Sequence, residues 1–177
     1  NTTASENTAV GYNALTSNVT GTANTAVGEE ALKNNTANNN TACGMQALKA
    51  NTSGSQNVAV GKEAGLSVTT GSKNVVVGSE ALYANTSGDQ NVAIGYNSLF
   101  ANTTADNNTA IGHGTLQSNT TGTQNIYNLR MGEYDAVWVF LISLAFVGFY
   151  IYIEARPKGS NLFGNISDTI SRFFRQK

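Results

Sequence analysis

The chain has 177 residues and a formal net charge of −1, and charged residues make up only 12% of it, about half the usual share. The small net charge gives no support to a nucleic-acid-binding role for the whole chain, and the single cysteine excludes an intrachain disulfide. A composition rich in Asn, Thr, Ala and Gly is typical of disordered linkers, but the apolar residues recur at fixed positions, which favours a folded repeat. Because the chain starts with Asn and no apolar signal stretch follows, we expect that a targeting segment was removed or that the natural start lies upstream.

A unit of 16 or 17 residues repeats seven times between residues 7 and 124. Internal repetition on this scale indicates a solenoid or a related repeat architecture. Each unit opens with an asparagine, which we number position 1, and has a glycine at position 5. The opening asparagines are Asn7, Asn24, Asn40, Asn57, Asn74, Asn91 and Asn108, and Asn125 opens a partial eighth unit. The glycines at position 5 are Gly11, Gly28, Gly44, Gly61, Gly78, Gly95 and Gly112.

Two short strand-like pieces are predicted in each unit, one at positions 2–4 and one around an Ala-Leu pair at positions 8 and 9. Side chains alternate between the two faces of a strand, so positions 2 and 4 share one face and position 3 lies on the other. Positions 2 and 4 carry mostly Thr, Val and Ile, whereas position 3 carries mostly Ala. We expect the β-branched face to point inward and the small face to lie against a close neighbour. Cys43, at position 4, is then expected to be a small buried hydrophobe.

These features predict an all-β fold, a parallel β-solenoid or β-roll of about seven 16–17-residue coils over residues 1–125. Wrapping one unit around the axis stacks like residues over like, so that rows of Val and Leu bury apolar area between coils. Stacked asparagines are expected to form amide ladders. Position 5 predicts a tight corner at each glycine, and the Thr-Ser-Gly run at 52–54 predicts a second corner. In the fourth unit Gly65 replaces the leucine, which follows one residue late as Leu66.

The run Asn-Thr-Ala-Val-Gly-Tyr-Asn-Ala-Leu at residues 7–15 resembles the head repeats of trimeric autotransporter adhesins. It is also similar to the related repeats of phage tail-fibre and giant-virus proteins, and the resemblance covers about residues 5–129. The resemblance implies a homotrimer of parallel β-rolls, with small residues where the chains meet. The coiled-coil stalk of such adhesins is not recognisable here.

A candidate membrane span lies at residues 136–153, which are 18 residues without a charge and just long enough to cross a bilayer as a helix. Aromatic residues lie near both of its ends, where they would contact lipid headgroups. The expected membrane-anchor residues are Trp138, Phe140, Leu141, Phe146, Phe149 and Tyr150. The alternative, a buried core helix, is disfavoured because no second helix long enough to cover such a surface is recognisable. Residues 126–135 are the predicted linker to this span.

The tail, residues 154–177, is predicted to be basic and to include an amphipathic helix. Its expected contact residues are Phe163, Ile166, Ile170, Phe173, Phe174, Arg172 and Arg175. They fit a membrane surface and a docking site on a protein partner equally well, whereas five basic residues are too few to favour packaged nucleic acid. By the positive-inside rule, the tail faces the cytoplasm or a virion interior, and the solenoid faces outside as the head of a single-pass protein.

Catalytic, metal-binding and cofactor-binding patterns are not recognisable, so an enzyme is not expected. His113 is the only histidine, and it stands at the variable position 6, which favours an exposed side chain. Cys43 has no basic neighbour in sequence that would make its thiol reactive. The acidic residues show no fixed pairing and are expected to be solvated; they include Glu29, Glu30, Glu63, Glu80 and Asp89.

Glycosylation sequons of the form Asn-x-Ser/Thr recur with the unit. Examples are Asn18, Asn51, Asn85, Asn102 and Asn119. Corner chemistry accounts for most of them, because the repeat itself places Asn before Thr and Ser at that point. Glycosylation requires a host that attaches glycans and side chains that point outward.

The expected function is that of a membrane-anchored structural surface protein, spike-like or adhesin-like, which projects a trimeric β-roll for attachment to an unidentified host-surface partner. It would belong either to a virus with a lipid membrane or to a bacterial cell surface, and copurification with virions or with cell envelopes distinguishes the two. The alternative is a small membrane subunit of a larger assembly, whose helix drives assembly and whose repeat domain is a decoration. Deletion of residues 1–125 separates these functions. No specific nucleic acid and no cofactor is expected.

Overall fold

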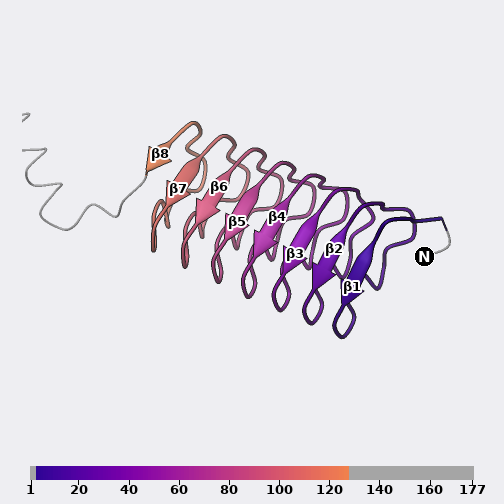
Figure 1. Ribbon diagram of the computed structural model, residues 1–177. Helices are drawn as coiled ribbons and strands as arrows, with labels where there is room; N and C mark the ends of the chain where they lie inside the picture. Colours follow the sequence, from indigo (N-terminus) through magenta and orange to yellow (C-terminus); the bar gives the residue numbers. More distant parts are fainter. Residues whose placement is uncertain (1–2, 128–177) are drawn as a thin grey trace, which may run out of the picture. The chain divides into compact units, whose positions relative to one another are not determined.

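Each repeat unit forms one coil of a parallel β-solenoid in the computed structural model, which describes residues 3–127 (Figure 1). One strand per coil joins a single sheet in the order β1-β2-β3-β4-β5-β6-β7-β8, and all neighbours are parallel. The strands are β1 (Thr8–Val10), β2 (Thr25–Val27), β3 (Thr41–Cys43), β4 (Val58–Val60), β5 (Val75–Val77), β6 (Val92–Ile94), β7 (Thr109–Ile111) and β8 (Ile126–Tyr127). The predicted solenoid of seven coils and the start of an eighth is therefore confirmed.

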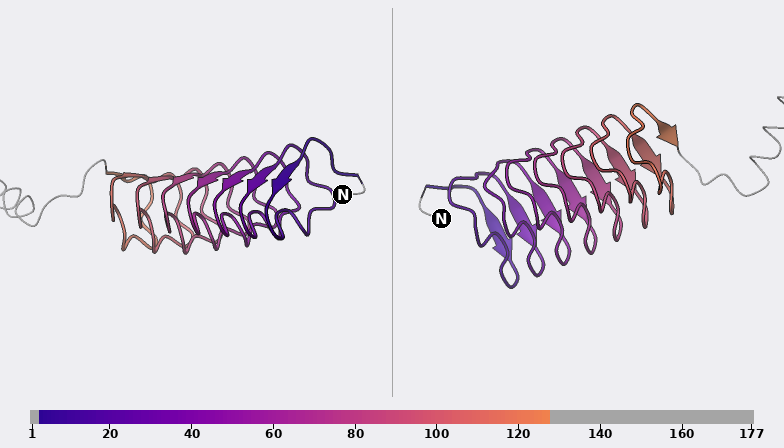
Figure 2. Two further views of the ribbon diagram at one scale, coloured as in Figure 1. Left: turned by 60° about the horizontal axis from the view of Figure 1, so that its bottom comes forward. Right: turned by 180° about the vertical axis from the view of Figure 1, so that it is seen from behind.

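The register between coils follows the repeat position by position. Thr8 pairs with Thr25 and Ala26 with Ala42, although coil 2 (residues 24–39) is one residue shorter than the others. Figure 2 shows the strands in one row along one side of the stack, with the turns of every coil in line behind and beside them. Like residues therefore stack over like along the whole axis, as the periodicity predicts.

The second predicted strand of each coil is absent from the described residues, and turns replace it. Four positions per coil have positive φ: the glycine at position 5, and three others that are mostly occupied by residues other than glycine. In coil 5, for example, Glu80 has φ 55°, Leu82 has φ 50° and Gln90 has φ 57°. None of these non-glycine residues is β-branched, as expected, because a branched Cβ is a poor fit to the left-handed region. The Ala-Leu pairs therefore serve as corner residues whose leucines point into the coil.

The core of the solenoid contains alanine from position 3 and the Ala-Leu pair from positions 8 and 9. Ala59, Ala81 and Leu82 are fully buried, as are their counterparts in the other internal coils. Positions 2 and 4 of the strands lie on the outside instead. The predicted inward β-branched face is thus wrong, because a coil of 17 residues already fills its interior with leucine and asparagine and leaves room for little more than a methyl group at position 3. Coil 5 is the exception, with Val76 buried at this position.

Two rows of buried asparagines hold the coils together, which confirms the predicted amide ladder. In the first row, at position 1, each Oδ1 accepts the backbone N–H of the asparagine one coil later; the Asn74 N–H donates to Asn57 Oδ1 at 2.9 Å. The Asn57 Nδ2 group donates to the Gly71 carbonyl at 2.9 Å, across the second corner of its coil. The second row, at position 12, includes Asn102, whose Nδ2 group donates to Asn85 Oδ1 at 3.1 Å. Most of these buried amides are thus used both within their coil and between coils; Asn18 bonds only within its coil, and Asn108 only to neighbouring coils.

The glycine at position 5 is required by the closeness of the coils. Gly44 has φ 142°, and a Cβ atom placed on it would lie 2.3 Å from the carbonyl oxygen of Gly61 in the next coil. No side chain fits at that distance, and few residues other than glycine adopt that backbone angle. The predicted tight corner is confirmed.

Candidate functional site

The most distinctive surface of the described chain is the outer side of its parallel sheet, which we call the strand face. It consists of two rows, at positions 2 and 4 of the coils, and most of these side chains are exposed. The position 4 row is Val10, Val27, Cys43, Val60, Val77, Ile94 and Ile111. The position 2 row is Thr8, Thr25, Thr41, Val58, Val75, Val92 and Thr109. An unbroken apolar row therefore follows the axis over seven coils.

Past the glycine corner, position 6 is mixed: it has Glu29, Lys62 and Ser79 in three coils and large apolar or aromatic residues in others. Tyr12, Met45 and Tyr96, all at position 6, are exposed by 71%, 37% and 46%. His113 follows Tyr96 in this row, and their rings stack with centroids 5.3 Å apart. The prediction of an exposed His113 is confirmed.

Cys43 lies on the strand face and is exposed, so its predicted burial is wrong. The cause is that the inward and outward faces of the strand are the opposite of those expected, so that position 4 points away from the coil interior. In the described part of the chain no group of three or more His, Cys, Asp or Glu residues is placed to hold a metal ion. The strand face is therefore chemically suited to association by apolar contact.

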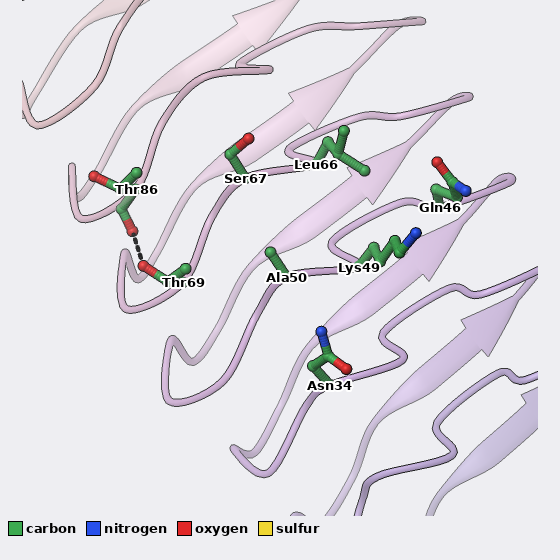
Figure 3. Close-up of a pocket in the computed structure, with 8 residues that line it drawn as sticks. All are labelled: Asn34, Gln46, Lys49, Ala50, Leu66, Ser67, Thr69 and Thr86. Atoms are coloured by element: carbon green, nitrogen blue, oxygen red, sulfur yellow. Dashed lines mark hydrogen bonds between the residues drawn. The ribbon is translucent and has the colours of Figure 1, made fainter.

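A shallow hollow of about 440 Å³ lies on a different side of the solenoid (Figure 3). Its lining residues are Asn34, Gln46, Lys49, Ala50, Leu66, Ser67, Thr69 and Thr86. Its lining comes from coils 2 to 5 and includes both irregular coils of the repeat, the short coil 2 and the fourth coil, where Leu66 is half-buried. The lining includes no carboxylate, histidine or cysteine, and the Thr69 hydroxyl donates to the Thr86 carbonyl at 2.9 Å.

Beside the hollow, Glu30 is the centre of a small ionic cluster. Its Oε1 atom lies 2.6 Å from Lys33 Nζ, and its Oε2 atom lies 2.7 Å from Lys49 Nζ. The Gln46 side-chain amide donates to the same Oε2 at 3.0 Å. The hydrogen bonds from Lys33 and then Lys49 lower the pKa of Glu30 from 4.5 to about 2, and the bond to Glu30 raises the pKa of Lys33. Glu30 is therefore not the freely solvated group that the sequence predicts, and it ties coil 2 to coil 3.

Comparisons with protein-family models, with curated proteins and with solved structures gave no match to this chain. Among residues 3–127 there is no helix that is both long and apolar enough to cross a membrane. The predicted membrane-anchor residues in 136–153 and the tail-contact residues in 154–177 lie outside the described residues.

The strand face is the candidate functional surface, and sequence reasoning placed it on the wrong side. Alternation correctly grouped positions 2 and 4, but it does not tell which group faces the core. The usable signal was the size of position 3, which is alanine in six of the seven coils. Such a uniformly small row fits the inside of a narrow coil better than it fits an open surface.

Proposed function

We propose that this chain is a membrane-anchored structural surface protein, spike-like or adhesin-like, whose β-solenoid self-associates through the strand face and is projected for attachment. The observation that carries the proposal is the uncovered apolar row at position 4 (Cys43 apart), with Val60 exposed by 40% and Val77 by 37%. Soluble monomers rarely leave a long contiguous apolar surface open to water. Association of copies covers it.

A second copy of the same chain is a suitable partner for this surface, because the strand face repeats regularly from coil to coil. Every coil presents the same two rows at the same spacing, so parallel copies placed around a common axis meet coil against coil with like side chains opposed. A closed symmetric assembly covers the face on every copy and leaves none to recruit further chains. The number three rests on the resemblance to trimeric adhesin heads.

The anchor in this proposal is the uncharged stretch 136–153, and the head lies outside the membrane. Basic residues after the stretch favour the tail on the inner side. The solenoid then stands between the membrane and an external partner, which suits a rigid repeat structure with long regular surfaces.

The experiment is a native mass measurement of the full chain in mild detergent, with and without charges on the strand face. The variant carries Val77→Lys and Ile111→Lys, both at exposed position 4 sites. Its matched control carries Thr70→Lys and Thr104→Lys, which are exposed at position 14 and away from the strands. We expect three chains per particle for the unchanged protein and for the control, and single chains for the strand-face variant, because each copy would place two ammonium groups in an apolar interface. Identical masses for the variant and the control would refute association through this face.

A further inference from the structure

The described residues contain eight sequons for N-linked glycosylation, and the structure divides them into two groups. The acceptor asparagines of the first group are held by hydrogen bonds of the solenoid; they are Asn18, Asn51, Asn85, Asn102 and Asn119. Those of the second group are exposed; they are Asn34, Asn39 and Asn107. The sequence motif alone does not distinguish the groups.

The first group belongs to the amide row at position 12. Asn51 is fully buried, and its Nδ2 group donates to Asn35 Oδ1 at 2.7 Å and to the Gly54 carbonyl at 2.8 Å. Asn102 uses both of its N–H bonds in the same way, toward Asn85 Oδ1 and the Ala105 carbonyl. A glycan replaces one of these hydrogens by a sugar ring, for which a fully buried amide has no space. The chain cannot carry a glycan here and keep this row.

The second group lies at corners and edges of the coils. Asn39 and Asn107 share position 17, the residue before the next unit, and have φ values of 60° and 59°. Asn34 lies at position 11, on the rim of the hollow in Figure 3. Among residues 3–127, none of these three side chains makes a hydrogen bond to another residue, and each is exposed. Their Nδ2 groups are therefore free to react, and a bulky substituent can extend into solvent.

We propose that Asn34, Asn39 and Asn107 are acceptor sites for N-linked glycans and that the five sequon asparagines at position 12 are excluded by the fold. The inference rests on the proposed placement of the head outside the membrane, which gives it access to the compartment of glycan transfer. The donor is an oligosaccharide attached to a polyprenyl diphosphate. A bond forms between Nδ2 and C1 of the first sugar while the bond from C1 to the diphosphate oxygen breaks. The amide loses one proton, the lipid diphosphate leaves, and nothing is oxidised or reduced.

The acceptor positions are compatible with association of the heads. None of the three asparagines belongs to positions 2 or 4, so the strand face of every coil stays free of glycan. A glycan on Asn34 would instead extend over the hollow, since this residue is part of its lining.

The test expresses the full chain in a glycosylating eukaryotic cell line, behind a cleavable signal peptide and a short N-terminal reporter sequon. Only chains with a glycosylated reporter are kept, which ensures that each analysed head reached the lumen. The protease-resistant fraction is deglycosylated enzymatically in heavy-oxygen water, which converts every glycosylated asparagine to labelled aspartate, and peptides are mapped by mass spectrometry. The matched control variant carries Asn34→Gln, Asn39→Gln and Asn107→Gln.

We expect label at Asn34, Asn39 and Asn107, no label at Asn51 or Asn85, and no label at any sequon of residues 3–127 in the triple variant. Chains modified at Asn51 or Asn85 before folding lose the amide row and drop out of the protease-resistant fraction. Label at Asn51 or Asn85 in that fraction, or no label at any of the three exposed sites, would overturn the inference. Alkaline extraction of the same membranes tests the anchor separately: release of correctly glycosylated chains would contradict the proposed membrane anchor and leave the acceptor sites standing.

Discussion

Val68 stands in coil 4 where Asn51 stands in coil 3, and the Oδ1 atom of Asn51 is left buried without a hydrogen-bond partner. At Asn35, Asn85 and Asn102 the next asparagine of the row donates to this oxygen, as Asn102 does to Asn85. Val68 also compensates for Gly65, which lacks the core leucine of the other coils. A Cβ atom on Gly65 would lie 3.4 Å from Val68 Cγ2, so the valine methyl groups occupy part of the missing leucine's space.

Because Val68 fills space that Gly65 leaves empty, we expect the effects of substitutions at residues 65 and 68 on stability to be strongly coupled. Gly65→Leu alone would collide with Val68 and with Leu48, whose Cδ2 atom lies 3.0 Å from the added Cβ. Val68→Asn alone would satisfy Asn51 but leave a cavity beside Gly65. The double variant restores the repeat, and we expect it to be more stable than the unchanged protein by about 2 kcal/mol. The free energies of unfolding of the unchanged protein, the two single variants and the double variant, measured with denaturant, form a double-mutant cycle. Additive effects of the two single changes would contradict the predicted coupling.

Removal of a ladder amide predicts a large loss of stability. Asn74→Ala deletes the acceptor of the Asn91 N–H, which is left buried without a partner. It also removes one of the two donors to the Gly88 carbonyl, which keeps its hydrogen bond from Asn85 Nδ2. The orphaned N–H costs about 1–3 kcal/mol, and the cavity left by a fully buried side chain adds to it, so we expect a total loss of at least about 2 kcal/mol. Asn34→Ala is the control, because Asn34 is exposed and alanine is already present at position 11 of other coils, such as Ala50. Its unfolding free energy should change by less than about 0.5 kcal/mol; equal effects would show that the ladder contributes nothing.

The glycine corner predicts a marked difference between two Gly→Ala substitutions. Gly44→Ala forces a methyl group against the Gly61 carbonyl, and we expect a loss of about 3 kcal/mol or more. At Gly114 an added Cβ atom meets open space, since its nearest neighbour is Gln117 Oε1 at 3.5 Å. The backbone of Gly114, at φ 62°, also has the conformation that Glu and Asn adopt at the same position in other coils. This second change should cost about 1–2 kcal/mol. Thermal unfolding compares the two, and an equally mild Gly44→Ala would mean that the coils are not this close.

The Glu30 cluster predicts a specific response to acid. The pKa of Glu30 falls from 4.5 in the free residue to about 2 in the folded chain, so the unfolded chain binds more protons between these values. Its stabilising effect is therefore complete above about pH 4.5 and is lost as the pH falls toward 2. Glu30→Gln should show a shallower decrease in unfolding temperature than the unchanged protein over this window. Parallel pH curves for the two proteins would contradict the cluster.

The number of coils, their register and the asparagine ladder could all be predicted from the sequence, because they follow from which positions repeat. Asn57 and Asn74 stack for the same reason that their glycines do. Which face of the strand points inward could not be predicted this way. Val60 and Ala59 lie on opposite faces whichever of the two is buried, and the usual preference for a buried valine holds only when the interior has room for it.

The candidate site shows the same limit of sequence reasoning. From the sequence of one chain, an apolar row such as Val60 and Val77 is expected to belong to the core, and only its exposure in the folded chain indicates a surface for association. Compensation between Gly65 and Val68 depends on contacts inside one coil, which periodicity does not describe. Sequons likewise have equal chemical form at Asn39 and Asn51, and burial alone separates them.

Thiol labelling of Cys43 tests the central claim most directly, namely that position 4 points out of the coil and is covered by other copies. The rate is measured on the full chain in mild detergent and on the variant with Val77→Lys and Ile111→Lys, in coils that do not adjoin Cys43. We predict slow labelling of the unchanged assembly and fast labelling of the dissociated variant, with the same circular dichroism for both. Fast labelling in both proteins would show that the face is uncovered, and slow labelling of a folded monomer would show that Cys43 lies inside the coil.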